Sequence, residues 1–108
     1  MKRYRIRIVE DAEHDLIDIY HYVALNDSPE KAAYILEQLE SLCLRLAELP
    51  HRGHIPPELD RISVTAYREV HFKPYRIIYE VIGQEVFIHS VLDGRRDIVS
   101  LLERRLLR

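Results

Sequence analysis

Arginine is the residue type in this chain with the most obvious capacity for chemistry. Thirteen of the 16 basic side chains are arginine. A guanidinium group is suited to two-pronged contact with phosphate or carboxylate, so clustered arginines favour an anion-binding surface. Four of them fall on the last three predicted strands or directly after them: Arg68, Arg76, Arg95 and Arg96. Salt bridges within the chain, to Glu69, Glu80 or Asp97, are an equally good interpretation of any one of them.

Residues that could act as nucleophiles or metal ligands do not form common catalytic motifs. The three glycines are far apart, which excludes a glycine-rich phosphate loop, and no serine lies in a G-x-S-x-G turn. The single cysteine, Cys43, lies on the apolar face of a predicted helix and is expected in the core. His51 and His54 flank a glycine, with only an acid such as Glu58 nearby. We therefore predict no metal site and no cofactor.

The charge of the chain is small in total but unevenly distributed. The chain has 108 residues, 47% of them hydrophobic, and a formal net charge of −2, which predicts one folded domain over residues 1–108. This balance excludes a polycation that wraps nucleic acid. Residues 1–8 carry a net charge of +4, residues 9–60 carry −9 and residues 61–108 carry +3. Such a dipolar chain predicts a charged partner, although two helices solvated by acidic side chains explain most of the −9.

No apolar run in the sequence is long enough to cross a bilayer, and the N-terminus lacks the apolar segment of a secretory signal. We therefore expect a cytoplasmic protein with no membrane partner.

Hydrophobic periodicity predicts an α+β fold with the element order β-α-α-β-β-β-α. Alternating apolar and basic residues predict a first strand, and apolar residues at helical spacing then predict two antiparallel helices. The predicted elements are strand 4–8, helices 12–25 and 29–49, a proline-rich loop 50–60, strands 66–72, 75–82 and 85–92, and a helix from 98. The predicted N-caps of the helices are Asp11, Ser28 and Asp97. A helical hairpin packed on a largely antiparallel four-stranded sheet fits this order.

Two-residue turns at Lys73-Pro74 and Gly83-Gln84 determine which strand residues share a face. The face toward the helical hairpin is then Val70, Phe72, Tyr75, Ile77, Tyr79, Val81, Val86, Ile88, Ser90 and Leu92. The opposite face is Glu69, His71, Arg76, Ile78, Glu80, Phe87, His89 and Val91. Its mixture of apolar and charged side chains is typical of a surface that binds a partner. The pattern leaves open which face Arg68 occupies.

Three short motifs, in order along the chain, resemble those of the RelE/ParE superfamily of type II toxins. They are Tyr67-Arg68-Glu69, the run from Pro74 to Val81, and Gly94-Arg95-Arg96-Asp97 before a leucine-rich end. The start of the first helix is also similar to that family, at Ala12, Asp15, Leu16, Ile19 and Tyr20. The resemblance covers nearly the whole chain and implies the same β-α-α-β-β-β-α fold.

The resemblance implies one of two functions, because the superfamily performs both on one fold. RelE-like members cut messenger RNA in the ribosome, which requires a general base, a general acid and cations around the phosphate. The candidate catalytic residues for that chemistry are Arg68, His71, Arg76, His89 and Arg95. However, Val70 stands where RelE has a second strand lysine, and the last helix has no tyrosine or histidine. ParE-like members instead poison DNA gyrase.

These departures favour a ParE-like toxin that inhibits DNA gyrase by binding rather than by catalysis. The resemblance implies neutralisation by a cognate ParD-like antitoxin, in an expected heterotetramer, with operator DNA reached only through the antitoxin. The alternatives are a ribosome-dependent mRNA endoribonuclease and a non-toxic corepressor that only binds its antitoxin. The predicted target-binding residues are Arg76, Arg95, Arg96, Arg104 and Arg105. The predicted antitoxin-binding residues are Arg76, Ile78, Phe87, His89 and Val91.

Overall fold

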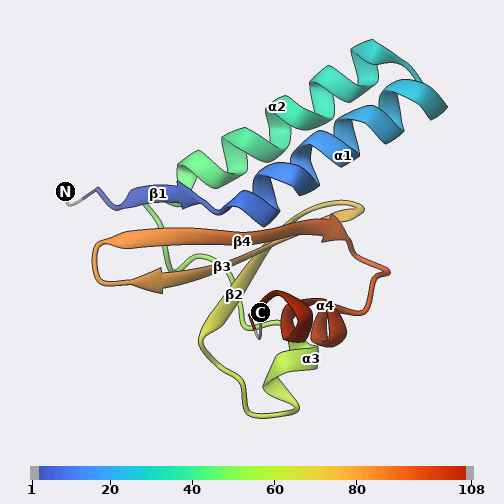
Figure 1. Cartoon of the computed structure of the whole chain (residues 1–108). Helices are drawn as coiled ribbons and strands as arrows, with labels where there is room; N and C mark the ends of the chain where they lie inside the picture. Colours follow the sequence, from blue (N-terminus) through green and yellow to red (C-terminus); the bar gives the residue numbers. More distant parts are fainter. Residues whose placement is uncertain (1–2, 107–108) are drawn as a thin grey trace.

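The computed structural model describes residues 3–106, and its elements follow the order predicted from the sequence with one additional short helix. The elements are β1 (Arg5–Ile8), α1 (Glu10–Asn26), α2 (Pro29–Arg45), α3 (Pro57–Asp60), β2 (Tyr67–Phe72), β3 (Tyr75–Ile82), β4 (Glu85–Asp93) and α4 (Ile98–Leu106). The paired helices α1 and α2 cover one face of the sheet, and α3 and α4 lie on the other side (Figure 1). Within the described part, no helix is long and apolar enough to span a membrane.

The sheet has the strand order β1-β4-β3-β2 and confirms the predicted fold class. β1 pairs with β4 in parallel, and the other two pairs of neighbouring strands are antiparallel. Both antiparallel connections are two-residue turns, as predicted. Gly83 begins the second turn with a φ of 60°, a conformation that costs glycine little because it has no Cβ.

Two apolar clusters hold the layers together. The larger one joins the hairpin to the sheet and includes Leu39, Ile77 and Tyr79, all fully buried. Cys43 belongs to it as predicted, and burial raises the pKa of its thiol to about 12, so it is not a poised nucleophile. The smaller cluster joins α3 and α4 to the opposite face of the sheet: Leu59, Tyr67, Ile78, Leu92, Ile98, Leu101 and Leu102.

A register shift between β3 and β4 overturns part of the predicted division of faces. Ile77 pairs with Val91 and Ile78 with Ser90, but Tyr79 pairs with Ile88, so His89 is the extra residue of a bulge. Beyond the bulge, each side chain of β4 lies on the face opposite to the one predicted from strict alternation. Val91 therefore packs in the hairpin core and Leu92 in the α4 cluster, which is the reverse of the prediction.

The helices differ from the prediction in three further respects. The N-cap of α1 is Val9 rather than Asp11, and it makes no side-chain cap bond. The other two predicted caps are confirmed, because Ser28 Oγ accepts a hydrogen bond from the Lys31 amide and Asp97 Oδ1 accepts one from the Ser100 amide. The second helix ends at Arg45 rather than at residue 49. The segment predicted as a loop contains the short helix α3, which begins at Pro57.

Candidate functional site

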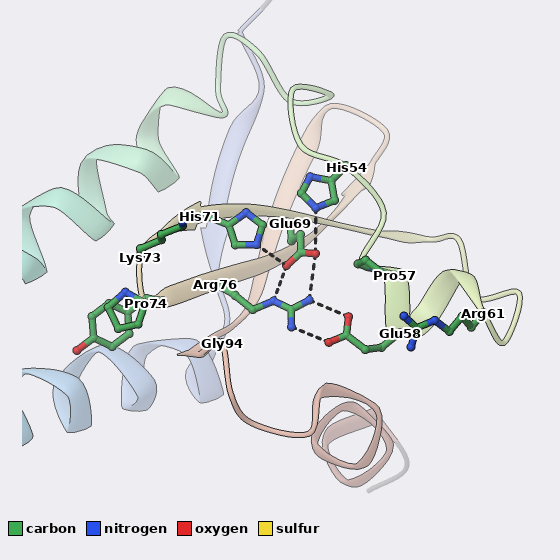
Figure 2. A pocket seen from close by; sticks show the side chains of 11 residues that line it. His54, Pro57, Glu58, Arg61, Glu69, His71, Lys73, Pro74, Arg76 and Gly94 are labelled. Atoms are coloured by element: carbon green, nitrogen blue, oxygen red, sulfur yellow. Dashed lines mark hydrogen bonds and ion pairs between the residues drawn. The ribbon is translucent and has the colours of Figure 1, made fainter.

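The centre of the candidate site is Arg76 on β3, which lies between two carboxylates from other elements. Its Nε and Nη2 donate to Glu69 on β2 at 2.6 and 3.0 Å. Its Nη1 and Nη2 donate to Glu58 on α3 at 2.7 and 2.9 Å. Figure 2 shows the guanidinium group between the two acids. These contacts raise the pKa of Arg76, and the hydrogen bonds from Arg76 lower the pKa of Glu58 to about 2.

Glu69 has the most unusual environment in this cluster, because its carboxylate is 1% exposed. Besides Arg76, it contacts Nε2 of His54 at 3.1 Å and Nε2 of His71 at 3.1 Å. His71 lies two residues after Glu69 on β2, and alternate residues of a strand point to the same face. His54 arrives from the loop before α3, whose backbone pairs with Glu69 in an isolated bridge.

A close backbone approach makes this loop position possible. The His54 amide donates to the Glu69 carbonyl at 3.2 Å, and the Glu69 amide donates to the His54 carbonyl at 2.8 Å. The preceding residue, Gly53, has no room for a side chain, since a Cβ there would lie 2.5 Å from the Glu69 carbonyl oxygen. Nearby, the Tyr79 hydroxyl accepts from the Gly53 amide and donates to the Pro50 carbonyl. The loop is therefore fixed to the sheet at several points.

The cluster borders a pocket of about 460 Å³, whose other lining residues include Arg61 and Lys73. Because Arg76 already binds two carboxylates, a phosphate that approached it would also meet their negative charge. The arrangement favours the salt-bridge interpretation of Arg76, with Glu69 as one of the predicted partners and Glu58 as the second. The polar groups best placed to bind something new are the two imidazoles and the carboxylate between them.

The other arginines predicted as site residues lie away from the Arg76 cluster. Arg68 lies on the hairpin side of the sheet and donates to the Gly53 carbonyl at 2.7 Å, which answers the question of its face. Arg95 pairs with Asp93 at 2.9 Å while its side chain stays 88% exposed. Arg96 and Arg104 are exposed. Arg95 and Arg96 follow β4 and Arg104 lies on α4, and all three leave their charge accessible.

Arg105 holds α4 against the rest of the fold. Its Nη1 and Nη2 donate to Asp15 on α1 at 2.8 and 2.7 Å, and Nη1 also donates to the hydroxyl of Ser90. Asp15 in turn accepts from the Val91 amide, so one buried acid joins α1, β4 and α4. This role of Asp15 was not among the sequence-based predictions. Its position on the apolar side of the predicted first helix, three residues after Ala12, was the available signal.

Four predicted site residues do not have the exposure expected of them: Ile78, Val91, Arg76 and Arg105. Ile78 and Val91 are completely or almost completely buried, so the expectation that they belong to an exposed sheet face is wrong. Arg76 and Arg105 direct their guanidinium groups at carboxylates of this chain rather than at solvent. His89 pairs with Glu80 at 3.1 Å and its ring contacts Tyr67.

Comparison with known proteins decides the family. A family model described as ParE toxin of type II toxin-antitoxin system, parDE, matches residues 6–98. The chain belongs to the ParE toxin family. It is also 28% identical over 95 residues to Toxin ParE3 of Caulobacter vibrioides, covering 84% of this chain and 87% of that protein.

Two solved structures share the fold of this ParE-family chain. One is a chromosomal ParDE toxin-antitoxin system from P. aeruginosa, with a TM-score of 0.72, 20% identity, and coverage of 86% of this chain and 98% of that chain. The other is the toxin-antitoxin complex RelBE2 from Mycobacterium tuberculosis, with a TM-score of 0.62, 20% identity, and coverage of 86% and 93%. The ParE and RelE forms of the fold therefore both resemble this chain in structure.

The ion pair of Glu58 predicts how the stability of this ParE-family domain depends on pH. The pKa of Glu58 falls from 4.5 to about 2 on folding, so its ionised form stabilises the fold above about pH 4.5. That contribution is lost as the pH falls from 4.5 toward 2. Near neutral pH, Glu58→Gln should lower the free energy of unfolding by roughly 1 kcal/mol, since a side chain 34% exposed is partly screened by solvent.

Urea unfolding of the wild type and Glu58→Gln across this pH range measures the difference. The two free energies of unfolding should converge as the pH approaches 2. A difference that stays constant with pH would contradict the assignment of the low pKa to Glu58. Glu48→Gln, at an exposed acid outside the cluster, is the matched control and should change little.

Proposed function

We propose that this ParE-family toxin arrests growth by binding DNA gyrase and that a cognate ParD-like antitoxin neutralises it. Membership of the ParE family over residues 6–98 carries the proposal. The separation of the candidate nuclease residues supports it. In the described residues, Arg68 is bound to the loop carbonyl of Gly53, while Arg95 lies beyond the end of β4.

The ribonuclease alternative would need a base and free cations around one phosphate. His71 and Arg76 do lie together, but Glu69 contacts both of them and Glu58 neutralises the guanidinium group further. The second candidate base, His89, is paired with Glu80. This geometry favours a protein that acts by binding over one that cleaves RNA.

Exposed arginines supply the proposed contacts with the target. Arg95, Arg96 and Arg104 are exposed on the segment after β4 and on α4. Leu101 and Leu102 of the same helix are buried against the sheet, so the helix has a fixed apolar face and presents Arg104 outward. We assign target binding to these three arginines and a structural role to Arg76 and Arg105.

The helical hairpin supplies the proposed surface for the antitoxin. Where α1, α2 and β1 meet, Ile8, Leu16, Ile17 and Leu36 line a pocket of about 430 Å³. Ile17 is 51% exposed, and Glu13 and Glu40 lie at the same pocket. An antitoxin segment with apolar side chains and a lysine or arginine fits this surface. An Ile17→Glu variant that the antitoxin still neutralises fully would contradict this placement.

Phe87 and His89 remain partly exposed, so their predicted part in antitoxin binding stays a prediction, as does the heterotetramer.

Growth arrest after induction separates binding from catalysis. The double variant His71→Gln/His89→Gln should stay toxic, because no base is needed for binding. If the protein were a ribonuclease, losing the base would reduce the rate by about 10²–10⁴-fold. Arg95→Ala/Arg96→Ala should instead weaken target binding by about tenfold or more, since a charge-assisted contact contributes about 1.5–3 kcal/mol.

The matched control is Arg45→Ala/Arg52→Ala, which removes two exposed arginines elsewhere on the chain and should leave toxicity unchanged. Loss of toxicity in the histidine variant, with the fold intact by circular dichroism, would favour the ribonuclease. A wild-type chain that binds its antitoxin but never arrests growth would favour the corepressor.

A further inference from the structure

The cluster of His54, Glu69 and His71 contains three metal-ligand groups that nothing in the proposed function uses. We propose that these three side chains bind a divalent transition-metal ion such as Zn²⁺ at the edge of the 460 Å³ pocket. Imidazole and carboxylate are the ligands that such ions take in proteins, and two histidines with one acid form a recurrent three-ligand set.

The distances within the cluster are close to those of a metal site. One ligand atom from each residue lies within 4.8 Å of the others. Each imidazole Nε2 is 3.1 Å from an oxygen of Glu69. Bonds of 2.0–2.1 Å to a tetrahedral ion place neighbouring ligands about 3.3 Å apart. Figure 2 shows both rings directed toward the Glu69 carboxylate, so small rotations of two histidines complete the geometry.

One of the three ligands is held in place and the other two are exposed enough to rotate, which suits metal binding. Glu69 is 1% exposed and is held by Arg76, which Glu58 holds in turn. Hydrogen-bonded outer partners of this kind orient ligating carboxylates. The side chains of His54 and His71 are 59% and 43% exposed, so they can turn to coordinate an ion without disturbing the core. Their ring centroids are already 5.3 Å apart.

Charge also permits a cation here. With neutral imidazoles, the paired groups Glu58, Glu69 and Arg76 carry a net charge of −1, while Arg61 and Lys73 line other parts of the pocket. Each Glu69 oxygen contacts Arg76 and one histidine, so an ion can take the histidine side of the carboxylate while Arg76 keeps the other. Glu58 balances the repulsion between the ion and the guanidinium group.

A bound ion would join two segments that the backbone already pairs. His54 lies in the loop before α3, and Glu69 and His71 lie on β2. The metal therefore crosslinks loop and sheet, and it should stabilise the folded chain because the unfolded chain has no assembled site.

Zinc binding to the full chain, purified without a polyhistidine tag, tests the proposal. Competition with a fluorescent chelator should show one Zn²⁺ per chain, and Co²⁺ should give the visible absorption of a tetrahedral site. His54→Gln and His71→Gln keep a polar side chain and remove the ligand nitrogen. Each substitution should weaken zinc binding by at least about 100-fold. Losing a residue that only hydrogen-bonds to a metal ligand costs up to about 100-fold, and losing the ligand itself should cost at least as much.

The control is His14→Gln/His21→Gln, which removes two exposed histidines of α1 and should leave the zinc affinity unchanged. Zinc should raise the melting temperature of the wild type and of this control but not of the two cluster variants. A wild-type chain that binds no zinc would overturn the proposal, and so would cluster variants that bind it as tightly as the wild type.

Discussion

Replacing Leu39 or Ile77 by alanine should lower the free energy of unfolding by about 2–5 kcal/mol. Both side chains are completely buried in the cluster between the hairpin and the sheet, so truncation leaves a cavity that rigid neighbours on two layers cannot fill. A domain of this size has a total stability of only about 5–15 kcal/mol. A large share of either variant is therefore expected to be unfolded at 37 °C, and its toxicity should fall with the amount of folded protein.

Leu44→Ala provides the matched control for Leu39→Ala, because Leu44 lies on the same helix and is 62% exposed. Its free energy of unfolding, measured by urea titration, should change by about 0.5 kcal/mol or less. Urea midpoints for Leu39→Ala and Ile77→Ala that match the wild type would disprove the packing of the hairpin on the sheet.

Replacing Arg76 by alanine should lower the free energy of unfolding by about 3–5 kcal/mol, because it leaves a buried carboxylate without its cation. Glu69 would keep only the two histidines as polar partners, and Glu58 would lose both of its hydrogen bonds to the guanidinium group. Toxicity should be lost with the fold. Arg95→Ala is the control, since its pair with Asp93 is exposed and should contribute little to stability.

A double variant separates a structural role of Arg76 from a direct contact with the target. Adding Glu69→Gln to Arg76→Ala removes the uncompensated charge, so the double variant should be more stable than the sum of the two single effects predicts. Urea unfolding of the two single variants and the double variant measures this coupling. An Arg76→Ala chain that is as stable as the wild type but not toxic would instead show that Arg76 contacts the target.

The order and type of the elements could be predicted because the responsible patterns are local. Alternation in the strands, helical spacing of leucines, and the Ser28-Pro29 start each depend on neighbouring residues alone. The bulge at His89 has no such pattern, because it moves one residue out of register within a strand that continues on both sides of it. Predicting the faces beyond it therefore failed at Val91 and Leu92.

The candidate site was only partly predictable for the same reason. Glu69 and Glu80 were the predicted partners of Arg76, but its second partner, Glu58, depends on a short helix in a segment with three prolines. The sequence placed His54 beside His51, whereas the fold brings it to Glu69 and His71 through a backbone bridge between distant segments. Contacts of this range are set by the tertiary structure and leave no spacing to recognise.

Supercoiling by purified DNA gyrase, followed in parallel with the integrity of a ribosome-bound transcript, tests the proposed function of the whole chain. The purified toxin should inhibit supercoiling in proportion to its concentration and leave the transcript intact. Prior addition of the cognate antitoxin should restore supercoiling. Transcript cuts at codon spacing, with gyrase activity unaffected, would contradict the proposal and identify the chain as a ribosome-dependent nuclease.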